Sequence, residues 1–150
     1  MVKASIELIE SYKEWLSQYR WIWFGTLTFS GYPSLRKATR IFDKFINEIR
    51  EKHGTRDFRW IRVTEHGADG NNLHFHVLIG GLHLQSGDRY MAMLRWQELA
   101  GESLITSFAS HRNGIYYILK TLRPGVDFEI DFLLEPIAPT GAKAHIRKHG

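Results

Sequence analysis

The chain has 150 residues, of which 43% are hydrophobic and 24% are charged, so we expect one compact domain and exclude a disordered chain. Lys and Arg number 20 against 16 Asp and Glu, a net charge of +4 that permits a polyanionic partner without requiring one. Cysteine is absent, which excludes disulfides and thiolate metal sites and leaves His, Asp and Glu as metal ligands.

Apolar spacing and turn signals predict the elements in chain order. They are a helix over residues 4–19 capped by Ser5, a strand over 20–29, a helix over 34–52 that stops at Gly54, a hairpin of strands 58–66 and 73–81, a helix over 88–100, a strand over 103–108, a helix over 113–122 and a last strand over 126–134. This order predicts an α+β fold in which helices pack on a central antiparallel β-sheet. We expect a domain over residues 1–135 and a basic tail over 136–150. No apolar run reaches the roughly 20 residues of a membrane span, so we expect no membrane contact.

The segment His74-Phe75-His76 in the second hairpin strand is the sharpest chemical feature of the sequence. Side chains alternate between the faces of a strand, so the two imidazoles project to one side and can share an ion. Glu65 joins them only if the hairpin pairs residue 65 with residue 74, because a slip of one residue moves its carboxylate to the other face. Two imidazoles and one carboxylate leave coordination positions open, which is typical of a catalytic rather than a structural metal site.

A facial triad of an iron oxygenase or a cupin site is a rival interpretation of two His and one carboxylate. A cupin would need its Glu shortly after His76, where this chain has Ile79-Gly80-Gly81, and many more strands. We therefore set this alternative aside.

A second constellation lies in the helix predicted over residues 113–122, where Tyr116 and Tyr117 are followed by Lys120. Both spacings, three and four residues, bring the ammonium to the helical face of a phenol, so spacing alone does not choose between the tyrosines. A phenol is a weak nucleophile at neutral pH unless a cation or a metal favours the phenolate. A Tyr–Lys pair on a helix more often lies on a solvated face without a catalytic role. The pair therefore indicates a catalytic site only in combination with the histidine motif.

In this order the motifs resemble those of the HUH endonucleases, and within them the rolling-circle replication initiators, or Rep proteins. The resemblance covers about residues 24–120: Phe24-Gly25-Thr26-Leu27-Thr28-Phe29 looks like the first Rep motif, His74-Phe75-His76 is the His-hydrophobe-His motif, and Tyr117-Ile118-Leu119-Lys120 matches the Tyr-x-x-Lys motif.

The resemblance implies an HUH, RRM-like fold and a site in which Glu65, His74 and His76 hold Mg²⁺ or Mn²⁺. It implies that Tyr117 attacks a phosphodiester of single-stranded DNA, such as an origin hairpin, with Lys120 adding positive charge. The products would be a 5′-phosphotyrosyl intermediate and a 3′-hydroxyl that primes rolling-circle replication of a plasmid, phage or virus. The reverse reaction rejoins strands.

Further contacts with DNA are expected from basic and polar side chains near these motifs. The candidates are Thr26, Thr28, Arg62, Arg112 and Tyr116, with Arg36, Lys37, Arg40 and Lys44 crowded on one helix and Trp21, Trp23, Trp60 and Trp96 as stacking candidates. Tyr116 leaves a mechanism with two tyrosines open, but neighbours on a helix point about 100° apart, which favours one nucleophile.

The chain lacks the Gly-x-x-x-x-Gly-Lys-Ser/Thr phosphate loop of a helicase, so we expect a separate host helicase as partner. We expect the protein in the cytoplasm of a bacterial or archaeal host, or wherever its replicon replicates. Two alternatives remain: an HUH transposase or relaxase, and a non-enzymatic RRM-like module that reads bases with sheet aromatics.

Overall fold

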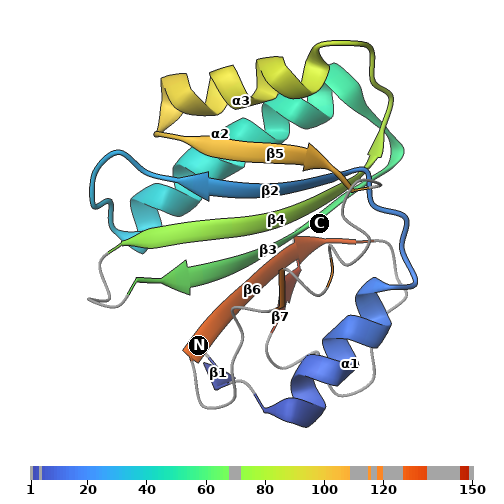
Figure 1. Cartoon of the computed structure of the whole chain (residues 1–150), viewed down its shortest axis with the longest axis vertical. Coiled ribbons are helices and arrows are strands. Elements are labelled where there is room, and N and C mark those ends of the chain that lie inside the picture. The colour runs from blue at the N-terminus through green and yellow to red at the C-terminus, as the bar shows by residue number, and fades with distance from the viewer. Residues whose placement is uncertain are drawn as a thin grey trace.

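The computed structural model describes residues 2–3, 5–67, 72–108, 115, 118–119, 127–134 and 146–148. Its elements are β1 (Val2–Lys3), α1 (Ile6–Leu16), β2 (Trp23–Thr28), α2 (Leu35–His53), β3 (Gly54–His66), β4 (Leu73–Leu82), α3 (Asp88–Leu99), β5 (Ser103–Ser107), β6 (Asp127–Leu133) and β7 (Ile146–Lys148). The predicted α+β fold is confirmed (Figure 1). Of the helix predicted over 113–122, residues 115, 118 and 119 are described and are helical. In the described part of the chain, no helix is both long and apolar enough to cross a membrane.

The predicted cap at Ser5 forms, and the structure shows a second cap of the same kind at Ser34. The Ser5 side chain accepts a hydrogen bond from the backbone N–H of Leu8, and Ser34 does the same for Lys37 at the start of α2. Gly54 ends α2, but the strand that follows begins there rather than at residue 58. The early residues of β3 are exposed and polar, and their pairing with β4 is interrupted by a register shift between Gly54 and Arg59. An irregular, solvated strand end of this kind carries no alternating apolar pattern in the sequence.

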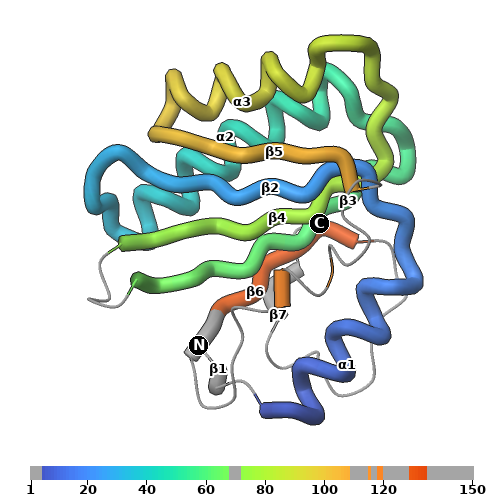
Figure 2. The backbone as a smooth tube through the Cα atoms, viewed as in Figure 1, coloured from blue at the N-terminus to red at the C-terminus, as the bar shows by residue number. Residues whose placement is uncertain are grey.

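In the described part of the chain the sheet has seven strands, and six of them follow the order β1-β6-β3-β4-β2-β5 with antiparallel pairing throughout. Within the expected basic tail, β7 pairs with β6 in parallel. The backbone trace shows the end of β2, the end of β3 and the start of β4 at one end of the sheet (Figure 2). Strands far apart in the sequence therefore meet at this end.

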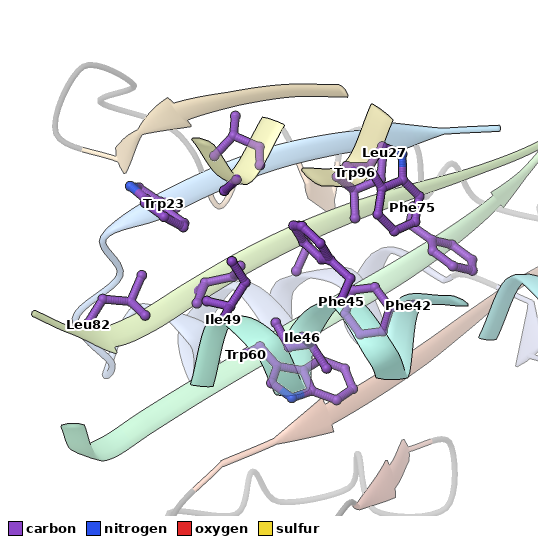
Figure 3. Packing of buried hydrophobic residues seen from close by; sticks show 14 of the residues in the cluster. Trp23, Leu27, Phe42, Phe45, Ile46, Ile49, Trp60, Phe75, Leu82 and Trp96 are labelled. Carbon is purple, nitrogen blue, oxygen red and sulfur yellow. The ribbon is translucent and has the colours of Figure 1, made fainter. Parts of the chain in front are cut away.

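One face of the sheet is covered by α2 and α3 (Figure 1). The apolar stripe of α2, which includes Phe42 and Phe45, packs on Trp60 and Phe75 of β3 and β4 (Figure 3). The rings of Phe42 and Trp60 meet edge to face at 4.9 Å between centroids, and those of Phe45 and Trp96 at 5.2 Å. Burial of these aromatic side chains is the main source of stability on this face.

The opposite face carries a second core built around α1. Its buried residues include Trp15 and Leu16 of α1 and Ile61, Val63 and Leu78 of the sheet. The Trp15 ring also meets Phe132 of β6 edge to face at 5.2 Å. The sheet is thus apolar on both faces, which explains why β3 and β4 form nearly continuous buried runs.

Candidate active site

The register of the central hairpin is the one that the site requires. β3 and β4 pair Glu65 with His74, so the carboxylate and the imidazole lie on the same face. β2 lies on the other side of β4 and pairs Thr26 with His76 and Thr28 with His74. The predicted pairing of residues 65 and 74 is confirmed, and two threonines of the first motif join the histidines on one face.

Glu65 and His76 are in direct contact. Glu65 Oε2 lies 2.6 Å from His76 Nε2, and the ring N–H donates to the carboxylate. The other ring nitrogen, Nδ1, lies 3.3 Å from Thr26 Oγ1; in the neutral imidazole it accepts the threonine hydroxyl hydrogen. The ring is thus held from both sides. The Glu65 side chain is 38% exposed and that of His76 is 11% exposed, so the carboxylate remains open to a ligand while the imidazole is anchored.

The donor set suits a divalent cation. One carboxylate and two neutral imidazoles fit Mn²⁺, and the carboxylate also fits Mg²⁺. In the structure the facing atoms of Glu65 and His76 bind each other, and among the described residues no three His, Asp or Glu side chains are arranged to hold an ion. The chemistry of the three residues fits a metal, and their joint ligation of one ion stays a prediction.

The tyrosine motif lies mostly outside the described residues: Arg112, Tyr116, Tyr117 and Lys120 are all there. Ile118 and Leu119, between Tyr117 and Lys120, are described and almost fully buried, at 0% and 3% exposure. Both belong to the core that contains Val63 and Leu78. Val63 pairs with His76 in the register, so this segment packs on the sheet face that carries the histidines.

Tyr12 also lies in the core of this face, yet its environment opposes a nucleophilic role. Its side chain is fully buried, and burial raises its pKa to about 12. The neutral phenol is therefore favoured at physiological pH, and no substrate can reach it.

The prediction that Arg62 contacts DNA is wrong. Pairing with Val77 and Asp131 puts Arg62 on the face covered by α2, where its side chain is 0% exposed. Its guanidinium binds Asp131 at 3.2 Å and lies 4.7 Å from the Phe42 ring centroid and 4.5 Å from that of Phe75. The four tryptophans proposed to stack on bases are buried too, at 0–4% exposure; they are Trp21, Trp23, Trp60 and Trp96.

The two threonines of the first motif take different roles in the structure. Thr26 contacts the ring of His76, a role that sequence reasoning missed because it depends on the pairing of strands 50 residues apart. The Thr28 hydroxyl donates to the carbonyl of Glu102 at 2.9 Å, which ties the end of β2 to the loop before β5. Their contact with DNA stays a prediction.

Comparison with protein families matches residues 22–124 to a family model that is described as replication-associated protein ORF2. The match contains His74, His76, Glu65 and the whole tyrosine motif, and it covers more than half of the chain. Comparison with curated proteins found no match, and neither did comparison with solved structures. The ordered motifs and the family match agree, and the chain belongs to this family of replication-associated proteins.

Proposed function

We propose that this replication-associated protein is a metal-dependent endonuclease and ligase for single-stranded DNA that nicks a replication origin to initiate rolling-circle replication. One observation carries the proposal: Glu65, His74 and His76 share the sheet face on which Ile118 and Leu119 pack. The three candidate metal ligands and the two described residues that follow Tyr117 in the sequence thus belong to the same face of the sheet.

In the proposed reaction, Tyr117 is the nucleophile, and the candidate metal ligands hold the ion that stabilises the phosphate. The phenol oxygen of Tyr117 attacks the phosphorus of a phosphodiester, forming a tyrosyl–phosphate bond to the 5′ side as the bond to the 3′ oxygen breaks. The phenol loses its proton, and the departing 3′ oxygen gains one to become the hydroxyl that primes synthesis. Attack of a 3′-hydroxyl on the phosphotyrosine reverses the step and joins strands.

Glu65, His74 and His76 would hold Mg²⁺ or Mn²⁺, which supplies charge stabilisation to the phosphate in the transition state. To ligate the ion, Nε2 of His76 would have to lose the hydrogen that it donates to Glu65, and the ring proton would then reside on Nδ1. Thr26 Oγ1 lies in position to accept a hydrogen bond from that Nδ1–H. Lys120 adds positive charge near the phenol or the phosphate.

Replacement of each tyrosine by phenylalanine tests the nucleophile. We expect Tyr117→Phe to abolish the covalent adduct between the protein and single-stranded DNA, because it removes the attacking oxygen, whereas Tyr116→Phe keeps it. The measurement is a denaturing gel of protein incubated with Mn²⁺ and a labelled random single-stranded DNA pool. An adduct that survives in Tyr117→Phe and disappears in Tyr116→Phe would overturn the assignment.

Chelation tests the metal. We expect EDTA to stop cleavage and added Mn²⁺ to restore it, and we expect His74→Ala and His76→Ala to reproduce chelation by losing at least 100-fold in rate, on the order of the 10²-fold that one lost electrostatic contact costs. Titration calorimetry with Mn²⁺ reports binding independently of cleavage. His53→Ala, far from this face at the end of α2, is the matched control. Full cleavage in EDTA would refute the metal's role.

A further inference from the structure

A hollow of about 310 Å³ opens beside the end of β2. Its apolar part includes Phe29, Ile41 and Leu99, and its polar part includes Ser30, Tyr32 and Lys37. The Tyr32 side chain is 76% exposed although it is a large aromatic, and Lys37 is exposed beside it. Ligand pockets begin at roughly 300 Å³, so this hollow suits one small occupant such as a single nucleotide.

The hollow is built on fixed backbone. Ser30 donates to the carbonyl of Ala100 through both its backbone N–H and its hydroxyl, at 2.9 and 2.8 Å. Trp96 Nε1 donates to the carbonyl of Thr28 at 2.8 Å. At Gly101 an added Cβ would lie 2.6 Å from the backbone nitrogen of Ser30, so only glycine permits this close approach. These contacts fix the backbone at the wall of the hollow formed by Ser30 and Ala100.

Some residues that line the hollow directly follow, in the sequence, a residue of the candidate active site. Thr28 pairs with His74, and Phe29 and Ser30 follow Thr28 directly into the hollow. The ring of Phe29 also meets that of Phe75 at 5.3 Å, and Phe75 points to the face covered by α2, so the hollow lies on the face of the sheet opposite the histidines. A strand of DNA that leaves the histidine face around the end of β2 would therefore reach the hollow.

The charge around the hollow favours an anion. The first turn of α2 carries Arg36 and Lys37 and has no acidic residue. Cations are unfavourable at the N-terminus of a helix, where the macrodipole is already positive, so their presence there costs stability unless an anion approaches. Arg40, one turn further, is also exposed.

We propose that this hollow is a subsite for one nucleotide of the DNA strand where the strand passes around the end of β2 from the histidine face, with Tyr32 stacking on the base and Lys37 contacting the phosphate of that nucleotide. The proposal rests on the proposed function, because it takes single-stranded DNA as the substrate. An exposed aromatic beside a cation is the arrangement by which proteins hold single strands without reading sequence.

Binding of a fluorescein-labelled oligo(dT) strand, followed by anisotropy in EDTA so that cleavage does not interfere, tests the subsite. We expect Tyr32→Ala to weaken binding about tenfold through loss of stacking. We expect Lys37→Ala to lower the slope of log affinity against log salt concentration by about 0.7, the value for one phosphate contact on a single strand. Thermal melting of each variant checks that these exposed substitutions leave the fold intact.

Tyr90→Ala and Lys52→Ala are the matched controls. Tyr90 is 60% exposed at the start of α3, and Lys52 is exposed in the last turn of α2, about 22 Å from Lys37 along the helix. We expect both to bind oligo(dT) as the wild type does. A strand that carries 5-iodouracil should also crosslink to Tyr32 on irradiation, with the attached peptide identified by mass spectrometry.

The results of these experiments distinguish failure of the proposed subsite from failure of the proposed endonuclease function. If the wild type binds DNA and forms the tyrosine adduct but Tyr32→Ala and Lys37→Ala bind with unchanged affinity and salt slope, the subsite is refuted and the endonuclease stands. If the wild type neither binds single-stranded DNA nor forms an adduct, both proposals fall.

Discussion

Arg62 carries its charge in the interior of the protein, between the rings of Phe42 and Phe75 and beside Asp131. A buried charge without its partner is costly, because the interior does not replace the solvation that it lost. We expect Asp131→Ala to lower the free energy of unfolding by about 3–5 kcal/mol, measured by urea denaturation.

The double variant Arg62→Met, Asp131→Leu is the control for this pair. It removes both charges and keeps apolar volume, so we expect it to recover most of the stability that Asp131→Ala loses. A double variant as unstable as Asp131→Ala would show that the cost lies in packing rather than in the unpaired charge.

At the scale of an element, β4 depends on a glycine where the hairpin becomes irregular. Gly81 has φ +69°, and a Cβ there would lie 2.2 Å from the carbonyl oxygen of Asp57 in β3. We expect Gly81→Ala to destabilise the protein by more than about 2 kcal/mol, because strain at a positive φ adds to a clash with backbone that cannot rotate away. Thermal or chemical denaturation measures the loss.

Gly87 provides the comparison, since it has φ +92° but an added Cβ there would meet no atom within 4 Å outside its two chain neighbours. Its replacement by alanine carries only the conformational penalty, about 1 kcal/mol. Equal losses at the two positions would contradict the close approach between β3 and β4.

At the scale of the whole molecule, the sheet separates a core under α2 and α3 from a core that contains the segment next to Tyr117. Ile46 is buried in the first and Ile118 in the second. We expect Ile46→Ala and Ile118→Ala each to cost about 2–5 kcal/mol of stability. If Tyr117 is the nucleophile, as we propose, only Ile118→Ala should slow formation of the tyrosine adduct, because Ile118 follows Tyr117 directly in the chain and is buried in the second core.

Single-turnover adduct formation at a temperature where both variants remain folded measures this difference. An equal loss of rate in Ile46→Ala would mean that general stability, rather than the packing of the tyrosine segment, controls the reaction.

Local patterns in the sequence predict the candidate metal ligands and much of the secondary structure. The two-residue repeat of a strand places His74 and His76 on one face, and the spacing of apolar residues predicts α2 within one residue at each end. These features depend on neighbours in the chain, so a local pattern contains them.

Which residues from distant segments meet depends on how the helices and strands pack together. The sequence offered Arg62 and four tryptophans as candidates for DNA, but the face on which α2 packs buries Arg62 and the two cores bury the tryptophans. The sequence did not reveal that Thr26 pairs with His76, or that Ser30, Lys37 and Leu99 line one hollow. Alternation along a strand tells which side chains share a face, but packing between elements determines whether that face is buried or open.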